Sequence, residues 1–272
     1  MTTAAASTYW DDLDPRYRVI LCDIWGVVHD GLRLSPNAAE RLAQWRGQGR
    51  TVILVTNAPR PADSVAVQLD RIGLPRECWN GISTSGEAGI AALIKLGEQP
   101  GFVGTTEDRA LLEAHGLRFA DAAYHDLAVT GLFEDRMDPE AYTADIAHWR
   151  AADIVMHCLN PDRIVHHAGT IEACAGALGD AYEAAGGHVE WYGKPHATIY
   201  HHALGLAGDP PPHTVLAIGD SLRTDMLGAA RSGFDAVFVQ SGIHAGEPWP
   251  SDFAAANGLG DWHPIAIVDG LA

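Results

Sequence analysis

Lysine is nearly absent from this 272-residue sequence, which has sixteen arginines but only two lysines, Lys95 and Lys194. Asp and Glu outnumber Lys and Arg by 35 to 18, which gives a formal net charge of −17. A surface this acidic repels nucleic-acid backbones and anionic lipid headgroups, so we expect neither nucleic acid nor a membrane as a partner. Because lysine is so rare, each of the two is a candidate for a specific role.

Long apolar runs are missing as well. Nowhere do 18 apolar residues follow one another, and the N-terminal MTTAAASTYWDDLDP has no basic segment leading into an apolar one. We therefore expect neither a membrane helix nor a signal peptide, and we predict a cytoplasmic protein. Cys22, Cys78, Cys158 and Cys174 form no C-x-x-C pair, so we interpret them as small buried side chains.

Short apolar runs alternate with segments of helical periodicity, which is typical of parallel βαβ units and predicts an α/β fold. The helix that follows the first strand is expected to start with Ser35 as its N-cap and Pro36 at its first position. The tail over 241–272 has no clear periodicity and is expected to be irregular. The pattern predicts strands over 18–22, 51–55, 81–83, 101–103, 127–130, 154–158, 189–191, 215–218 and 236–239, and helices over 61–72, 86–96, 107–114, 139–151, 171–185, 197–206 and 222–232.

Polar residues follow several of these strands. In an open parallel sheet, chemistry takes place beyond the carboxyl ends of the strands. Three carboxylates that converge there with a lysine would be costly unless a hard cation joined them, and Mg²⁺ prefers oxygen ligands. One Asp would then serve as a nucleophile, and the lysine would neutralise phosphoryl oxygens. The residues at these strand ends are Asp23, Thr56, Asn57, Lys194 in YGKP, and Asp220 and Asp225 in GDSLRTD.

Each of these residues alone is more often a turn or cap residue than a catalytic one. They occur, however, in four short motifs in a fixed order, and this ordered set is a much more specific indication of function than any single residue. The motifs are DIWGVVHDG (23–31), VTNAPRP (55–61), YGKP (192–195) and GDSLRTDMLGA (219–229). The ordered set resembles the haloacid dehalogenase (HAD) superfamily of aspartyl phosphotransferases. The long insertion between the second and third motifs, with CLNPD at 158–162, is similar to the C2-type cap of class IIA, the nitrophenylphosphatase and nucleotide- or sugar-phosphate phosphatase group.

The resemblance implies a Rossmann-like parallel-sheet core with an inserted α/β cap. We predict that the core comprises residues 1–98 and 188–272, and the cap residues 99–187. Lys95 precedes this cap, so it is not expected to form a Schiff base as in a phosphonate hydrolase. The histidine pairs at 166–167 and 201–202 lack the spacing of zinc ligands, and we do not expect zinc.

Site roles also follow from the resemblance. It implies that Asp23 is the nucleophile, and that Thr56 and Lys194 bind the phosphoryl group together with backbone amides. It implies a Mg²⁺ site, with Asp225 orienting a metal-bound water or the lysine. Asn160 and Asp162 of the NPD loop are expected near the leaving group. The implied amides are those of Trp25, Gly26 and Asn57, and the implied metal ligands are Asp23, the Trp25 carbonyl and Asp220.

Trp25 departs from the family pattern. Phosphatases of this type usually have an Asp two residues after the nucleophile, which protonates the leaving group, and an indole cannot transfer protons at neutral pH. A positioned acid or base contributes about 10²–10⁴-fold, so efficient hydrolysis of alkyl phosphates is in doubt. His29, Asp30 and His196 are open alternatives as proton carriers, although a polar turn is the more common role for the first two.

We therefore predict a Mg²⁺-dependent enzyme that hydrolyses a small phosphomonoester, of the sugar-phosphate or nucleotide-monophosphate class, through an aspartyl-phosphate intermediate. Turnover is expected to be slow or restricted to good leaving groups. The alternative is a non-catalytic or regulatory protein that binds phosphorylated ligands on the same scaffold. A small phosphorylated metabolite is the expected partner, and homo-oligomerisation is left open.

Overall fold

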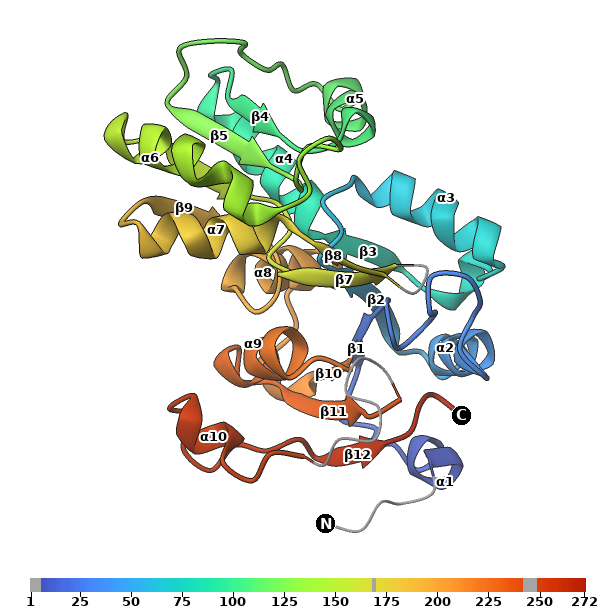
Figure 1. Ribbon diagram of the computed structural model, residues 1–272. Coiled ribbons are helices and arrows are strands. Elements are labelled where there is room, and N and C mark those ends of the chain that lie inside the picture. Colours follow the sequence, from blue (N-terminus) through green and yellow to red (C-terminus); the bar gives the residue numbers. More distant parts are fainter. Residues whose placement is uncertain (1–5, 168–169, 242–248) are drawn as a thin grey trace. The chain divides into compact units, whose positions relative to one another are not determined.

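The computed structural model of the chain describes residues 6–167, 170–241 and 249–272 (Figure 1). The chain divides into two compact units, and each is described by itself. The first unit comprises Met1–Thr56, Ala66–Ser83 and Tyr200–Ala272, and the second comprises Asn57–Val65 and Thr84–Ile199. Within the described part of the chain, every helix is too short or too polar to cross a membrane.

A six-stranded sheet forms the centre of the first unit, in the order β12-β11-β10-β1-β2-β3. The five strands from β12 to β2 pair in parallel. All residues of β1 and β10 are buried, as expected for parallel strands that are covered on both faces. The strands are β1 (Val19–Asp23), β2 (Thr51–Thr56), β3 (Gly81–Thr84), β10 (Val215–Gly219), β11 (Asp235–Val239) and β12 (Ala266–Val268).

The helices of the first unit are short. The helix α3 (Ala62–Ile72) and the helix α8 (Ala197–Leu206) each contribute residues to both units. The others are α1 (Ala6–Asp11), α2 (Ala38–Gly47), α9 (Leu227–Arg231), α10 (Phe253–Ala256), the 3₁₀ turns Arg76–Cys78 and Pro212–Thr214, and a π-helical turn Leu222–Met226.

A parallel four-stranded sheet, in the order β4-β5-β6-β9, lies at the centre of the second unit, which also has the antiparallel hairpin β7-β8. One apolar cluster packs α6 and α7 on the sheet, and another packs α4 and α5. The elements are β4 (Gly101–Val103), β5 (Asp126–Val129), β6 (Val155–Cys158), β7 (Ile164–His167), β8 (Thr170–Ala173), β9 (His188–Trp191), α4 (Ser85–Leu96), α5 (Thr106–Ala114), a 3₁₀ turn Pro139–Tyr142, α6 (Thr143–Ala151) and α7 (Ala175–Ala184).

Most predicted elements are confirmed, but several details are wrong. Helix α2 begins at Ala38, and its N-cap is Asn37 in a left-handed conformation, because the Ser35 carbonyl instead accepts the Ala38 N–H in a preceding turn. The predicted helix 171–185 starts only at Ala175, since its first residues pair with β7 as strand β8. The tail is not wholly irregular, because it adds β12 to the edge of the first sheet.

The pairing of strand β9 bears on the site, because β9 pairs with β6 in the four-stranded sheet. Lys194 therefore follows a strand of the second unit. The boundaries predicted for core and cap, at 98/99 and 187/188, stay a prediction.

Candidate functional site

Three carboxylates meet at the carboxyl ends of neighbouring strands in the first unit. Asp23 is the last residue of β1, Asp220 directly follows β10, and Asp225 lies in the π-helical turn after it. Their exposed fractions are 6%, 2% and 5%, and one oxygen from each lies within 4.8 Å of the others. This convergence is the one predicted from the strand ends. Three buried anions this close together fit a site for a cation.

Gly26 fixes how the loop after Asp23 passes Asp220. Its φ is +77°, and a Cβ added there would lie 2.0 Å from Asp220 Oδ2. The backbone of the loop therefore runs directly against this carboxylate. A side chain at position 26 would have to displace either the loop or Asp220.

The π-helical turn positions Asp225. Ser221 caps the turn, with its hydroxyl accepting the Thr224 N–H, and its own N–H donates to Asp225 Oδ2 at 3.3 Å. A Cβ at Gly219 would lie 2.1 Å from Asp225 Cγ, so the strand end also packs against this side chain. Single π-helical turns occur often at functional sites, because they re-aim side chains.

Thr56 ends β2 beside Asp23. The strands pair with Asp23 opposite Val55, so Thr56 is one residue beyond that pair, and its side chain is buried. The structure thus places Asp23, Trp25, Gly26, Thr56, Asp220 and Asp225 in the first unit, and Asn57, Asn160, Asp162 and Lys194 in the second.

The Trp25 loop offers no free imidazole for proton transfer. The indole packs edge-on against His29, with ring centroids 4.9 Å apart, and also against Gly31. The Gly31 N–H donates to His29 Nδ1 at 2.9 Å, which occupies the basic nitrogen of the ring. Burial lowers the pKa of His29 to about 4, so the ring is neutral at pH 7.

Asp30 has the geometry of a turn residue. Its Oδ1 accepts the N–H groups of Leu32 and Arg33, both at 2.8 Å, and the side chain points to solvent. These backbone hydrogen bonds lower the pKa of Asp30. The polar-turn interpretation is thus favoured for His29 and Asp30.

In the second unit, the Asn57 side chain forms hydrogen bonds with both the N–H and the carbonyl of Lys194. The Lys194 N–H donates to Asn57 Oδ1 at 2.7 Å, and Asn57 Nδ2 donates to the Lys194 carbonyl at 3.1 Å. Asn57 Nδ2 also donates to Asp162 Oδ1 at 2.9 Å. Lys194 is 4% exposed. One amide therefore fixes both the lysine loop and the NPD loop.

Within the NPD loop, the two polar side chains have different tasks. Asn160 Oδ1 accepts the Asp162 N–H at 3.1 Å, which closes an Asx turn, while the Asp162 carbonyl accepts the Gly176 N–H. Asp162 presents its carboxylate to Asn57. Asn160 shapes the loop, and Asp162 carries its charge.

A hydrogen-bonded chain of polar side chains leads to the segment that carries Lys194, and it was not predicted from the sequence. His157 Nδ1 lies 2.7 Å from the Tyr192 hydroxyl, and His157 Nε2 lies 2.7 Å from Asp126 Oδ1. A histidine inside the otherwise apolar strand β6 was the available signal. Both ring nitrogens of His157 are engaged, and the side chains of His166 and His167 lie outside the described residues.

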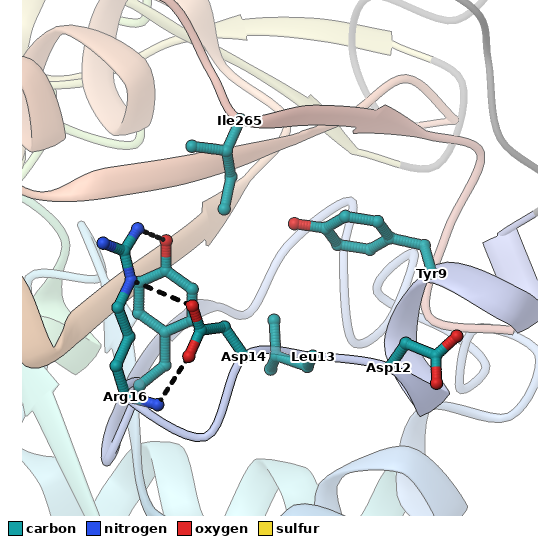
Figure 2. A pocket seen from close by; sticks show the side chains of 7 residues that line it. Tyr9, Asp12, Leu13, Asp14, Arg16 and Ile265 are labelled. Atoms are coloured by element: carbon teal, nitrogen blue, oxygen red, sulfur yellow. Dashed lines mark hydrogen bonds and ion pairs between the residues drawn. The ribbon is translucent and has the colours of Figure 1, made fainter.

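An open groove of about 490 Å³ lies elsewhere on the first unit (Figure 2). All of its lining residues except Ile265 precede β1, whereas Asp23 is the last residue of that strand, which is about 16 Å long at 3.3 Å per residue. Arg16 is engaged by the Tyr17 hydroxyl, Asp14 and Asp235. The groove is therefore not where the carboxylates meet. Its lining is Tyr9, Asp12, Leu13, Asp14, Arg16, Tyr17 and Ile265.

Comparison with known proteins points in one direction. Two family profiles match, one for haloacid dehalogenase-like hydrolases over residues 20–118 and one described as HAD-hydrolase-like over residues 191–267. A haloacid dehalogenase-like hydrolase from Brucella suis 1330 is 31% identical, has a TM-score of 0.83 and aligns over 96% of this chain and 98% of its own. Ribonucleotide monophosphatase NagD of Escherichia coli (strain K12) is 28% identical over 233 residues, 82% of this chain and 88% of the relative. Chronophin of Rattus norvegicus is 27% identical over 268 residues, 93% and 85% of the two chains.

Proposed function

Because this chain belongs to the haloacid dehalogenase-like hydrolases, class IIA, we propose that it hydrolyses small phosphomonoesters. The observation that carries the proposal is the buried group of Asp23, Asp220 and Asp225 at the ends of β1 and β10. The resemblance to a ribonucleotide monophosphatase supports the same reaction class. Sugar phosphates and nucleotide monophosphates are the substrate classes we propose.

Mg²⁺ fits the donor set. Three buried carboxylates offer hard oxygen ligands, and their mutual repulsion is relieved when a divalent cation joins them. Asp23, Asp220 and the backbone carbonyl of Trp25 would hold the ion, with Asp225 orienting the surrounding groups. A bound Mg²⁺ would neutralise negative charge on the phosphoryl oxygens.

Asp23 is the proposed nucleophile. One of its carboxylate oxygens forms a bond to phosphorus while the bond between phosphorus and the leaving oxygen breaks, which gives an aspartyl phosphate and the released alcohol. Water then attacks phosphorus, the Asp23–phosphorus linkage breaks, and inorganic phosphate leaves. The first step needs a proton for an alkyl leaving group, and the second needs an acceptor for a proton of the water.

Thr56 and Lys194 are the proposed ligands of the transferred group, together with the amides of Trp25, Gly26 and Asn57. Thr56 and Asn57 are neighbours in the chain, and the Asn57 side chain holds the Lys194 main chain by two hydrogen bonds. This supports a common task for the second and third motifs. Preorganised donors of this kind stabilise the charge that develops during phosphoryl transfer.

Asn160 and Asp162 are proposed to lie on the leaving-group side. The hydrogen bond between Asp162 and Asn57 supports a link between the NPD loop and the phosphate-binding residues. With Trp25 in place of the usual acid, and with His29 neutral and engaged by Gly31, we propose that hydrolysis is slow or restricted to good leaving groups.

A panel of phosphorylated metabolites together with nitrophenyl phosphate, assayed for phosphate release with and without Mg²⁺, tests this function. We expect Mg²⁺-dependent release that disappears in Asp23→Asn. Parent-level turnover in Asp23→Asn would rule out aspartyl chemistry.

The second candidate, a non-catalytic protein that binds phosphorylated ligands, is favoured by Trp25. It predicts that parent protein and Asp23→Asn both bind metabolites from the panel and that neither releases phosphate. The cytoplasmic location and the partners stated above stay predictions.

A further inference from the structure

A hydrogen-bonded chain of the partly buried Asp126 and the buried His157 and Tyr192 ends two residues before Lys194. It crosses the four-stranded sheet, since Asp126 begins β5, His157 lies in β6 and Tyr192 follows β9. Both hydrogen bonds measure 2.7 Å, and the rings of His157 and Tyr192 stack with an angle of 14° between them. His157 and Tyr192 are 4% and 6% exposed, so water does not replace these contacts.

The donor and acceptor groups of Asp126, His157 and Tyr192 indicate which residue donates each hydrogen bond. An ionised carboxylate only accepts, so the hydrogen bond to Asp126 places the imidazole proton on Nε2. When the ring is neutral, its Nδ1 is then an acceptor, and the Tyr192 hydroxyl donates to it. Burial raises the pKa of Tyr192, which keeps the phenol protonated as this arrangement needs. Asp126 thus orients His157, and His157 holds Tyr192.

Apolar side chains surround the Tyr192 end of this chain. Ala128, Leu159 and Leu112 pack with Tyr192 in one cluster. A buried polar chain adds little to stability compared with apolar packing of the same shape, but it fixes one arrangement of the groups that it joins. The group fixed here is Tyr192.

The backbone from Tyr192 to Lys194 has little freedom. A Cβ at Gly193 would lie 2.4 Å from Asn57 Oδ1 and 2.6 Å from Pro161 Cδ, and the Lys194 peptide is held by Asn57. The segment is thus held at one end by His157 and at the other by Asn57.

We propose that His157, oriented by Asp126, is a positioning residue that acts through Tyr192 to hold Lys194 where it binds the phosphoryl group. This rests on the proposed function, in which Lys194 contacts phosphate. Loss of the hydrogen bond lets the lysine loop shift, and small displacements of a binding group cost up to about 100-fold in catalysis.

Tyr192→Phe tests the proposal, with Tyr182→Phe as its matched control. Tyr182 is also buried in the second unit, and its hydroxyl donates to the Ile154 carbonyl at 2.6 Å, away from the lysine loop. Calorimetric titration of the full chain with inorganic phosphate in the presence of Mg²⁺ gives the dissociation constant. We expect it to rise about tenfold in Tyr192→Phe and to stay at the parent value in Tyr182→Phe. Equal values in the two variants overturn the proposal.

Two replacements of His157 separate the two hydrogen bonds. The amide of Asn reaches the position of Nδ1 and can still accept from Tyr192, whereas the amide of Gln reaches the position of Nε2 and faces Asp126. We expect phosphate binding by His157→Asn to stay closer to the parent than that by His157→Gln. The same dissociation constant for both variants contradicts a role through Tyr192.

Lys194→Met distinguishes failure of the premise from failure of this proposal. If Lys194→Met binds phosphate like the parent, the lysine has no phosphate-binding role. Both that proposed role of Lys194 and the positioning role of His157 are then wrong. If Lys194→Met loses phosphate binding while Tyr192→Phe matches Tyr182→Phe, only the positioning role is wrong. In the expected case, adding Tyr192→Phe to Lys194→Met causes no further loss, because both changes remove the same contact.

Discussion

Gly26 and Asp220 lie so close together that the loop after β1 and the end of β10 fit only with glycine at position 26. The distance from an added Cβ to Asp220 Oδ2 would be 2.0 Å, and the φ of +77° already disfavours any other residue. The main chain at Gly26 thus packs directly against the Asp220 carboxylate at the edge of the group of three aspartates. This relationship gives a test of the metal site in which all three aspartates are retained.

Gly26→Ala is expected to weaken Mg²⁺ binding and to destabilise the fold by more than the ~1–2 kcal/mol that a left-handed alanine costs. Gly49→Ala is the matched control, because Gly49 has a φ of +81° with nothing within 4 Å of an added Cβ. Urea denaturation and calorimetric Mg²⁺ titration of both variants measure the two effects. Equal Mg²⁺ affinity in Gly26→Ala and Gly49→Ala would show that contact with Asp220 does not shape the site.

Asp220→Ala should lower Mg²⁺ affinity more than Asp225→Ala. We place Asp220 among the ligands, whereas Asp225 Oδ2 already accepts the Ser221 N–H and serves to orient its neighbours. Loss of an orienting group typically costs about 10–100-fold in metal affinity, and loss of a ligand costs more. Titration of the two variants with Mg²⁺ under the same conditions gives the order, and the reverse order would exchange the two roles.

The core of the fold could be predicted from the sequence because its strands are continuous apolar runs. Val19–Asp23 and Val215–Gly219 are buried throughout. Asp23 ends the first of these strands and Asp220 directly follows the second, so both could be placed at one edge of the sheet without knowing the pairing. Helix α2 buries Ala38, Leu42 and Trp45, a spacing typical of one helix face. Its start could not be predicted, since the left-handed conformation of Asn37 depends on the turn before it.

Pairings between distant segments could not be predicted. The segment from Thr170 to Ala173 has apolar and polar residues compatible with a helix, and only its partner Ile164–His167 makes it a strand. Lys194 follows strand β9, which pairs with β6 in the four-stranded sheet. The rule that neighbouring parallel strands bring their carboxyl ends together places Asp23 and Asp220 at one edge of the six-stranded sheet, but it does not place Lys194 there. The hydrogen bonds of Asn57 join residues 105 and 137 positions apart.

Protonation of His29 should destabilise the folded chain in mild acid. The unfolded imidazole binds a proton below about pH 6.5, whereas the folded ring does so only below about pH 4. Between these values the unfolded state binds more protons, so the free energy of unfolding falls as the pH is lowered, by at most about 3 kcal/mol. Below pH 4 both states are protonated, and this contribution stays constant.

His29→Asn isolates that contribution, because the Asn amide can still accept the Gly31 N–H but does not titrate. Urea denaturation of the parent and the variant at pH 7, 5.5 and 4 measures the difference. We expect the parent to lose more stability than the variant between pH 6.5 and 4. An identical pH dependence would mean that His29 titrates normally and is free to carry protons.

Trp25→Asp tests the proposal that the Trp25 loop lacks a proton carrier. If proton transfer limits hydrolysis, turnover of alkyl phosphates should rise far more than turnover of nitrophenyl phosphate, whose leaving group departs without a proton. The gain is bounded at about 10⁴-fold. It will be smaller if the indole, which packs against His29 and Gly31, leaves a void that loosens the loop.

Trp25→Asn is the matched control for that void, because it removes the indole and has nearly the shape of Asp but cannot transfer a proton. A gain on alkyl phosphates in Trp25→Asp that is absent in Trp25→Asn assigns the effect to acid and base catalysis. Equal turnover of both variants on both substrates, with Mg²⁺ binding intact, would mean that proton transfer does not limit the reaction. Because His29 Nδ1 accepts the Gly31 N–H and burial lowers the pKa of this ring to about 4, we expect the proton in that case to come from solvent or from a group outside the Trp25 loop.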